Sequence, residues 1–364
     1  MEALGRDFDV CALGTEPALA GSFARKGLRY RTYRMSRGAS PLGDLYSLWR
    51  LVRIFREERP AVVHTFDSKP GIWGRLAAKL SGVPVVVGTL PGLGSLYAAP
   101  SWKGRLVRLV YQPLQTLACH AADLTTFQNE DDAREFERRR VVPAARAAVI
   151  PGSGVQTAVF APAAPEAAAE LRTGIGLDGD IVALMITRLV RSKGVLEFAA
   201  AAKAARSANP AVTFLLVGPE DADSLDAMTP EELDDVRDSV TWLGQRDDVR
   251  DVLAAADIFV FPSFYREGVP RVLLEAASMG LPLVAADVPG SRDVVEDGVN
   301  GFLVPPRDAT AIAEAVLRLA AAPELRQRFG ASSRERALAR FDLTHVAAQI
   351  EAVYRDLLTA KRVL

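Results

Sequence analysis

Short runs rich in β-branched residues alternate with helical stretches along almost the whole chain, and this alternation limits the possible folds more than any other feature. Such alternation is typical of parallel sheets whose strands are joined by crossover helices. In the first half we expect strands at Phe8–Leu13, Ala61–Thr65, Val83–Thr89, Leu124–Phe127 and Ala147–Ile150. The pattern restarts in the second half at Ile181–Ile186, Val212–Val217, Val240–Leu243, Ile258–Phe261, Pro282–Ala286 and Phe302–Val304. The sequence therefore predicts an α/β protein with two parallel sheets.

A segment enriched in Gly, Pro and Ala, residues 151–168, separates the two series of strands. A length of 364 residues also favours two domains. We predict a first domain over residues 1–157 and a second over 158–341, both doubly wound and facing a central cleft. Apolar residues at helical spacing predict a closing helix within 342–364 that packs back on the first domain. In such sheets ligands bind at the carboxyl ends of the strands.

Composition argues against several classes of protein. The three histidines and two cysteines show no zinc-binding spacing, and we expect Cys11 and Cys119 to be reduced core thiols of a cytoplasmic protein. No apolar run is long enough to span a bilayer. Residues 1–150 hold 22 Lys and Arg against 14 Asp and Glu, a net +8, whereas the remainder holds 22 against 31, a net −9. A basic half suits an anionic membrane, nucleic acid or plain solvation, but no nucleic-acid recognition module is found, so we expect no nucleic-acid partner.

The stretch FYREGVPRVLLEAASMG, which starts at Phe264, predicts a helix with an anion-binding start. Pro270 fits the first turn, and Gly268 allows the backbone to approach a ligand closely. The free N–H groups of Gly268, Val269 and Arg271 would then face a phosphate or the hydroxyls of a sugar.

Glu275 lies within this apolar helix, where an ionised carboxylate needs hydrogen-bond donors. A ribose diol could supply them, and so could a salt bridge to Arg271 one turn earlier. Eight residues of helix rise about 12 Å, more than the roughly 9.5 Å that separates the widest glycosidase carboxyl pairs. Glu267 and Glu275 therefore address different parts of a long ligand, and a nucleotide sugar fits better than hydrolysis.

A second cluster, TRLVRSKG, follows the first strand of the second half. Arg188 and Lys193 are five positions apart in a strand-to-helix connection, so both can reach one anion at the end of that strand. A guanidinium fork and an ammonium group suit a diphosphate, whose negative charge grows as it leaves. Taken alone, the two residues could equally be surface cations at the start of a helix.

The motifs of the second half resemble, in order and spacing, the nucleotide-binding half of retaining glycosyltransferases of family four, which have the GT-B fold. They are TRLVRSKG, LLVGPE, WLGQRDDV, FYREGVPRVLLEAASMG and PGSRDVVEDGVNGFLVPPRD. The first half resembles the same family through SRGASPLGDL, HTFDSKPGIWGRLAAKLSGVP, PGLGSLY and TFQNEDDAREF. The chain is most similar to bacterial enzymes that add N-acetylhexosamine to a polyprenyl-diphosphate-linked saccharide.

The resemblance implies a role for each matching residue. Arg188 and Lys193 would hold the donor diphosphate, and Glu275 the ribose. The transferred sugar would be held by Glu267 and the backbone of Gly268, Val269 and Pro270. The base pocket would be lined by Gly244, Gln245 and Arg246. Such enzymes transfer the sugar on one face with the help of the leaving diphosphate, and no cofactor or metal is implied.

The chain departs from the family pattern in two places. Many members carry a histidine in the loop after the strand Val83–Thr89, where this chain has Pro91, so we assign only backbone at Gly92 and Gly94 there. Family members also begin with a strand, a Gly-rich loop and a helix before the strand that Phe8–Leu13 resembles. This first strand–helix unit is expected to be missing, which would leave backbone groups of the sheet unpaired. The DAD sequence at Asp221 imitates a metal site of another glycosyltransferase fold, and we expect no metal there.

Two basic segments of the first half combine apolar faces with aromatic residues, DLYSLWRLVRIFREERP and SWKGRLVRLVYQPLQTLACH. In the first, Leu45, Leu48, Val52 and Phe55 fall on one predicted helical face, with Trp49 near its boundary. Basic amphipathic segments suit an anionic bilayer surface, although packing on the domain's own sheet explains the apolar faces as well.

The sequence therefore predicts a metal-independent glycosyltransferase that moves a sugar, N-acetylhexosamine, from a UDP-sugar to a saccharide or polyprenyl-diphosphate-linked acceptor in surface polysaccharide assembly. We expect it in the cytoplasm, peripheral on the inner face of the plasma membrane. A non-catalytic nucleotide-sugar-binding subunit, or an inactive truncated homologue, is the alternative. A sugar-nucleotide epimerase would need side chains placed for elimination, which the motifs do not offer.

Overall fold

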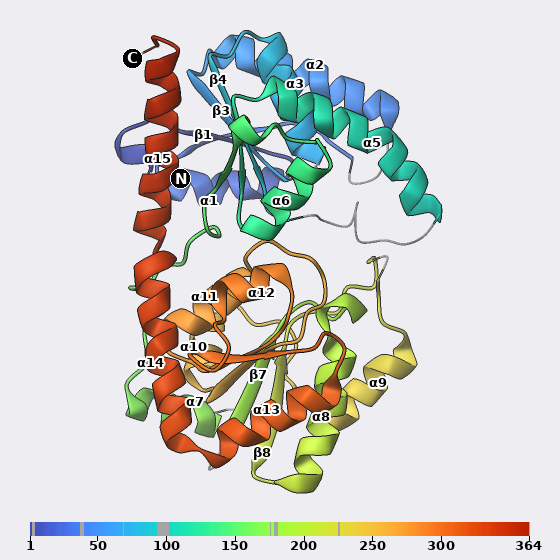
Figure 1. The fold of residues 1–364 in the computed structure, drawn as a ribbon, viewed down its shortest axis with the longest axis vertical. Helices are drawn as coiled ribbons and strands as arrows, with labels where there is room; N and C mark the ends of the chain where they lie inside the picture. Colours follow the sequence, from blue (N-terminus) through green and yellow to red (C-terminus); the bar gives the residue numbers. More distant parts are fainter. Residues whose placement is uncertain are drawn as a thin grey trace. The chain divides into compact units, whose positions relative to one another are not determined.

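The computed structural model describes residues 1, 4–36, 40–67, 69–92, 102–174, 176–177, 181–224 and 226–363. The chain divides into two compact units, which Figure 1 shows as two α/β bodies. Unit 1 comprises Met1–Pro151 with Thr344–Leu364, and unit 2 comprises Gly152–Leu343. The sequence analysis placed the boundary after Thr157, whereas the structure places it after Pro151. The C-terminal helix α15 (Leu343–Ala360) belongs almost wholly to unit 1.

Unit 1 contains two separate parallel sheets rather than one. The strands are β1 (Cys11–Gly14), β2 (Arg29–Thr32), β3 (Val62–Phe66), β4 (Val85–Leu90), β5 (Leu124–Phe127) and β6 (Ala147–Val149). β1 pairs with β2 alone, and the larger sheet has the order β3-β4-β5-β6. Within the described residues, β1 and β3 are not hydrogen-bonded to a common strand.

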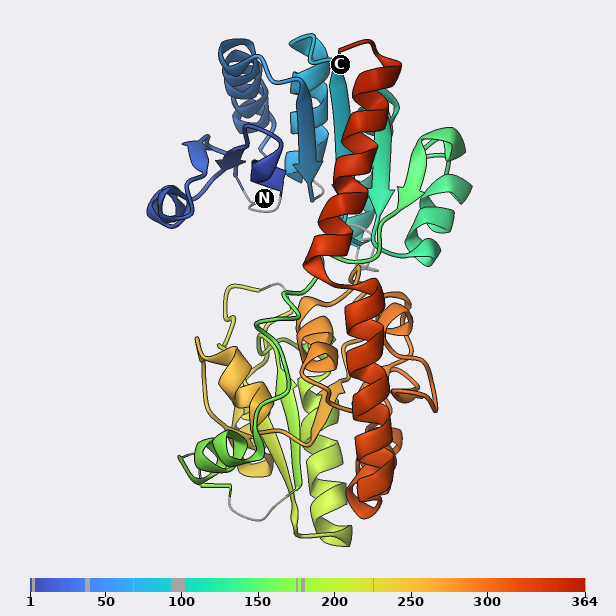
Figure 2. The ribbon, with the colours of Figure 1, turned by 90° about the vertical axis from the view of Figure 1, so that its left-hand side faces the viewer.

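Helices cover both faces of the four-stranded sheet. The helices of unit 1 are α1 (Ala20–Arg25), α2 (Pro41–Glu58), α3 (Lys69–Leu80), α5 (Trp102–Ala121), α6 (Glu130–Arg138) and α15. α2, α3 and α5 pack on the face that carries Val63 and Val86. α15 packs on the opposite face, against Val85 and Val87 through Tyr354 and Leu358, and Figure 2 shows it running along the sheet. Alternate residues of each buried strand thus face different helices, as expected for a sheet covered on both sides.

Only part of the predicted apolar face of α2 is packed in the structure. The helix buries Asp44, Ser47, Leu51, Ile54 and Phe55, whereas Leu45 is exposed. Polar contacts fix this orientation, because Asp44 forms an ion pair of 2.7 Å with Lys69 and the Ser47 hydroxyl donates to the Arg34 carbonyl at 2.6 Å. Of the apolar face predicted at Leu45, Leu48, Val52 and Phe55, the last three pack on the core of unit 1, whereas Leu45 does not.

Unit 2 is built on one six-stranded parallel sheet with the order β12-β11-β10-β7-β8-β9. Its strands are β7 (Ile181–Ile186), β8 (Val212–Val217), β9 (Thr241–Trp242), β10 (Ile258–Phe261), β11 (Leu283–Ala286) and β12 (Gly301–Val304). Its helices are α7 (Pro165–Gly174), α8 (Val195–Ala208), α9 (Pro230–Ser239), α10 (Val249–Ala254), α11 (Arg271–Ser278), α12 (Pro289–Val294), α13 (Ala309–Ala321) and α14 (Pro323–Arg340), with the 3₁₀ turn η4 (Arg191–Lys193). α8, α9 and α13 bury one face of the sheet, and α10, α11 and α14 bury the other. Unit 2 is therefore a doubly wound, Rossmann-like domain.

None of the helices in the described part of the chain is both long enough and apolar enough to cross a membrane.

Candidate functional site

The chain changes direction across the sheet of unit 2 at β7. From β7 it continues to β8 and β9 on one side, and it later returns to β10, β11 and β12 on the other side. β7 and β10 are paired neighbours, so the loops after them leave the same edge of the sheet side by side. Ligands of open α/β sheets bind at such a switch point.

The loops after β7 and β10 are hydrogen-bonded to each other. The backbone N–H groups of Phe264 and Tyr265 donate to the Ser192 carbonyl at 3.1 and 3.2 Å. Gly194 follows in the left-handed region with φ 78°, and a Cβ there would lie 2.4 Å from the Pro262 carbonyl oxygen. Glycine is required on both counts, because a side chain would clash and L-residues rarely adopt this conformation.

Lys193 and Glu267 meet where these loops touch. The ammonium group lies 2.5 Å from the Oε1 atom of Glu267, and the Ser263 hydroxyl donates to the same oxygen at 3.1 Å. Lys193 also lies over the Tyr265 ring, 5.6 Å from its centre. The Lys193 side chain is only 13% exposed, which makes this a shielded ion pair rather than a solvated surface contact.

Arg188 lies in the loop after β7 and pairs with Asp221, which lies in the loop after the neighbouring strand β8. Gly218 makes this approach possible, since a Cβ there would lie 1.7 Å from the Thr187 carbonyl oxygen. The Arg188 side chain is 59% exposed. The sequence analysis expected Arg188 and Lys193 to share one anion, and the structure gives each cation its own carboxylate.

Asp221 and Ser263 are the polar groups of this site to which the sequence analysis assigned no role. Asp221 was considered only as an imitation of a metal site, although its position after a predicted strand indicated that it could line a site at the carboxyl edge. Ser263 lies two residues after the end of β10 and carried the same signal. Among the described residues, no group of three or more His, Cys, Asp or Glu side chains is placed to hold a metal ion.

Of the three backbone donors predicted at the start of α11, those of Gly268 and Arg271 have no acceptor among the described residues. Pro270 caps the helix in an extended conformation, and the Val269 side chain is buried in the core. α12 packs closely on this turn, because a Cβ on Gly290 would lie 1.5 Å from the Gly268 carbonyl oxygen.

Glu275 is buried and has one charged partner. The Arg271 Nε donates to Glu275 Oε1 at 2.9 Å, which is the salt bridge considered from the sequence. Burial raises the pKa of the Glu275 carboxyl, and the neighbouring Arg271 opposes this shift. Within the described residues the Oε2 atom of Glu275 accepts no hydrogen bond, so the carboxylate retains capacity for another donor.

Gly244, Gln245 and Arg246 follow β9 at the same edge of the sheet. Gly244 has φ 70°, and its carbonyl accepts a hydrogen bond from the Gly218 N–H at 2.8 Å, which ties this loop to the loop after β8. The Arg246 Nε donates to Asp248 at 2.8 Å. The structure thus brings the predicted donor-binding residues of unit 2 to the loops after β7, β9 and β10, except Glu275, which lies within α11.

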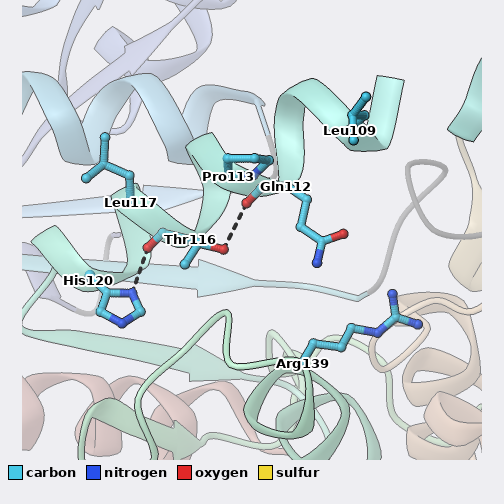
Figure 3. Close-up of a pocket in the computed structure, with 7 residues that line it drawn as sticks. All are labelled: Leu109, Gln112, Pro113, Thr116, Leu117, His120 and Arg139. Atoms are coloured by element: carbon cyan, nitrogen blue, oxygen red, sulfur yellow. Dashed lines mark hydrogen bonds between the residues drawn. The ribbon is translucent and has the colours of Figure 1, made fainter. Parts of the chain in front are cut away.

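In unit 1, Gly92 follows β4 with φ 154°, and Gly94 lies outside the described residues. Cys11 and Cys119 are free thiols, with Cys119 buried. A shallow pocket lies on the exposed side of α5, beside the end of α6, and Figure 3 shows the residues that line it: Leu109, Gln112, Pro113, Thr116, Leu117, His120 and Arg139. None of them is a residue that the sequence analysis placed in a site.

The chain matches family models along most of its length. Residues 1–153 match the model described as "Glycosyl transferase 4-like domain", and residues 180–322 match "Glycosyl transferases group 1". One relative is the UDP-Gal:alpha-D-GlcNAc-diphosphoundecaprenol alpha-1,3-galactosyltransferase of Escherichia coli, 33% identical over 291 residues that cover 78% of this chain and 73% of the relative. Another is the N,N'-diacetylbacillosaminyl-diphospho-undecaprenol alpha-1,3-N-acetylgalactosaminyltransferase of Campylobacter jejuni, 28% identical over 331 residues that cover 90% and 86%.

Solved structures share the fold. Anabaena HepE in complex with UDP-glucose superposes with a TM-score of 0.79 at 22% identity, covering 98% of this chain and 94% of that one. Sucrose-phosphate synthase from Thermosynechococcus elongatus also gives 0.79, at 26% identity, covering 99% and 92%. The relatives and the two domain matches show that the chain belongs to the group 1, family-four-like glycosyltransferases with the GT-B fold.

Proposed function

We propose that the chain transfers an N-acetylhexosamine from a UDP-sugar to a saccharide or polyprenyl-diphosphate-linked acceptor in surface polysaccharide assembly. The observation that carries the proposal is the Lys193–Glu267 pair at the switch point of unit 2, flanked by Arg188 and by the free N–H groups at the start of α11. Cations and free backbone donors at one sheet edge suit a sugar diphosphate. The activities of the two bacterial relatives support an undecaprenol-linked acceptor.

The donor lies along the carboxyl ends of the strands in this proposal. Gly244, Gln245 and Arg246 line the base, and Glu275 accepts hydrogen bonds from the ribose through its remaining oxygen. Arg188 and Lys193 bind the diphosphate. Arg188 is exposed enough to turn from Asp221 to a phosphate, and the Lys193 ammonium has further N–H donors beyond the one directed at Glu267.

Glu267 holds the transferred sugar together with the backbone of Gly268, Val269 and Pro270. Its ion pair with Lys193 links the sugar contact to the phosphate contact, so both groups are fixed by one interaction. Backbone at Gly92 and Gly94 contributes from unit 1.

The transfer breaks the bond between the anomeric carbon and the β-phosphate oxygen and forms one from the acceptor hydroxyl oxygen to the same carbon. The acceptor proton passes to the leaving diphosphate, and the configuration is retained. Lys193 and Arg188 stabilise the negative charge that grows on the diphosphate. The proposed reaction uses no metal and no cofactor. We also propose that the chain works in the cytoplasm, on the inner face of the plasma membrane, where such an acceptor is embedded.

A transfer assay tests the proposal. Purified chain is mixed with UDP-N-acetylglucosamine or UDP-N-acetylgalactosamine and a polyprenyl-diphosphate-linked sugar, and product and UDP are measured. We expect Glu267→Ala and Arg188→Ala to reduce transfer at least ~100-fold, the scale of losing one charged transition-state contact, with the melting temperature nearly unchanged. Full activity in either variant would refute the site, and binding of donor without any transfer would favour the non-catalytic subunit.

A further inference from the structure

The first half of α2 exposes a continuous stripe of large apolar side chains. Leu42 is 84% exposed, Leu45 57%, Tyr46 51% and Trp49 53%. Their spacing of three, one and three residues places them on one helical face. The centres of the Tyr46 and Trp49 rings lie 6.0 Å apart. Among the helices whose side chains are all described, none exposes as many large apolar side chains. We call these four residues the α2 stripe.

The helix beneath the stripe is firmly held. Asp44, on the opposite side of α2, pairs with Lys69 of α3 at 2.7 Å and accepts a hydrogen bond from Tyr111 of α5 at 3.2 Å. Leu51 and Ile54 are buried in the core beneath α2. The stripe is therefore a preformed surface and not a frayed helix end, and its apolar area is available to a partner without any loss of packing.

Charge around the stripe selects the partner. Asp44 is the one acidic residue between Ser40 and Arg56, and it is buried, whereas Arg50, Arg53 and Arg56 follow the stripe along the helix. Glu57 and Glu58 begin only at the far end, where Glu57 pairs with Arg53 and with Arg31 of β2, and Glu58 pairs with Arg29 of β2. The stripe thus lies in a surface of positive charge with no exposed carboxylate of α2 beside it.

We infer that the α2 stripe is the surface through which the chain docks on an anionic membrane. Tyr and Trp combine an apolar ring with a polar tip and are suited to the headgroup region of a bilayer. A helix that lies flat with leucines inserted and arginines beside it binds through buried apolar area and attraction to acidic lipids. The inference rests on the proposed lipid-linked acceptor, because that substrate must be reached at the bilayer surface.

Sedimentation with vesicles tests this docking surface. The full chain is mixed with phosphatidylcholine vesicles that contain about 30% phosphatidylglycerol or none, a composition that separates charge from apolar insertion. We expect binding only with phosphatidylglycerol, and the double variant Leu45→Ser, Trp49→Ser should weaken it at least ~10-fold. Leu80→Ser is the matched control, because Leu80 is 61% exposed at the end of α3, and it should bind like the unchanged chain.

The outcomes are distinguishable. Equal vesicle binding by the double variant and the unchanged chain overturns the inference, as does absence of binding by the unchanged chain. A dimer that the double variant disrupts, without vesicle binding, would make the stripe an interface between two copies and also overturn it. Transfer to a short-chain acceptor in detergent reports the proposed function separately, and the double variant should keep it. Melting curves confirm folding, and Leu42→Ser provides a second, milder variant.

Discussion

Gly88 shows how one residue without a side chain fixes the packing of unit 1. It lies in β4 between Thr65 of β3 and Thr125 of β5, and the Arg75 guanidinium rests on it, so a Cβ would fall 1.9 Å from Arg75 Nε. Arg75 is fully buried and donates to Thr65 Oγ1 at 3.2 Å and to Cys119 Sγ at 3.0 Å. Burial lowers the pKa of this guanidinium. Neither of these partners is a carboxylate, so the burial of Arg75 depends on close packing of the neighbouring residues around its guanidinium.

Gly88→Ala should therefore destabilise the chain by about 1–3 kcal/mol through overpacking. Chemical denaturation of Gly88→Ala, Arg75→Leu and the double variant measures the coupling. Because the added methyl group clashes with the guanidinium, Gly88→Ala should lower the free energy of unfolding clearly less in the Arg75→Leu background than in the unchanged chain. The same cost in both backgrounds would show that Arg75 does not set the need for glycine.

Glu275 gives a pH dependence of stability with a definite sign. Burial raises its folded pKa above the ordinary value of 4.5, so folding favours the protonated form. The stability that this group contributes is complete below pH 4.5 and is lost as pH rises through the folded pKa. Glu275→Gln should remove that loss, so its melting temperature should gain on the unchanged chain as pH rises above 4.5. A gap between the two melting curves that does not change with pH would contradict the assignment.

At the scale of elements, α15 is joined to the sheet of unit 1 by a buried chain of hydrogen bonds. The His64 Nδ1 lies 2.6 Å from the Tyr354 hydroxyl, and the His64 Nε2 lies 2.7 Å from Thr89 Oγ1, which in turn contacts Thr126 Oγ1 at 2.7 Å. The pKa of His64 is lowered to about 3, mainly by burial and to a smaller extent by the charge of Arg75. The imidazole therefore remains neutral in the folded chain under ordinary conditions.

Because the folded pKa of His64 is depressed, its contribution to stability is present above the unfolded value of 6.5 and is lost as pH falls toward about 3. Each unit of pKa shift is worth about 1.4 kcal/mol. His64→Gln should flatten the slope of the unfolding free energy between these pH values. Tyr354→Phe should cost about 1 kcal/mol near neutral pH through the lost hydrogen bond. Urea denaturation at several pH values checks both, and an unchanged slope in His64→Gln would be the contrary result.

The sequence predicted elements best where their residues are buried on both faces. The runs at β7, β8 and β10 were predicted with their observed bounds, since continuous β-branched and apolar residues mark a central parallel strand. β2, with the sequence RYRT, was missed because its two arginines interrupt the apolar run that marks a central strand, and none of its residues is buried. Periodicity also could not divide the apolar face of α2 between packing and exposure, because it cannot anticipate that Asp44 and Ser47 are buried while Leu45 is exposed.

For the candidate site, spacing placed Arg188 and Lys193 after one strand but left surface cations as an equal alternative, and the roles of these two residues and of Glu267 came from the family resemblance. The sequence could not predict which acidic residue forms an ion pair with which cation. Which carboxylate meets which cation depends on strand order, and only the β10-β7-β8 arrangement places Glu267 beside Lys193 and Asp221 beside Arg188. Each of the two cations is therefore paired with a carboxylate, which the net charge of the second half did not indicate.

At the scale of the whole molecule, the two units differ in charge and in the role that we propose for each. Unit 2 carries the proposed donor-binding residues and the acidic balance, and unit 1 carries the basic balance and the α2 stripe. A ligand that binds only the folded state stabilises it in proportion to the logarithm of its concentration. UDP should therefore slow hydrogen exchange in the loops after β7, β8, β9 and β10 while leaving α2 unchanged, and anionic vesicles should protect α2 and not these loops. Protection of α2 by UDP alone would contradict this division.

The central claim is that Lys193 and Glu267, joined at the switch point of unit 2, hold the diphosphate and the sugar of one donor molecule. Calorimetric titration of UDP into Lys193→Ala tests it most directly, with Lys203→Ala as the matched control, because Lys203 forms an equally short pair of 2.5 Å with Asp235 on the helical surface. Loss of one charge-assisted contact is worth about 1.5–3 kcal/mol, so UDP should bind Lys193→Ala roughly 10- to 100-fold more weakly and Lys203→Ala with unchanged affinity. Equal affinity in the two variants would contradict the claim.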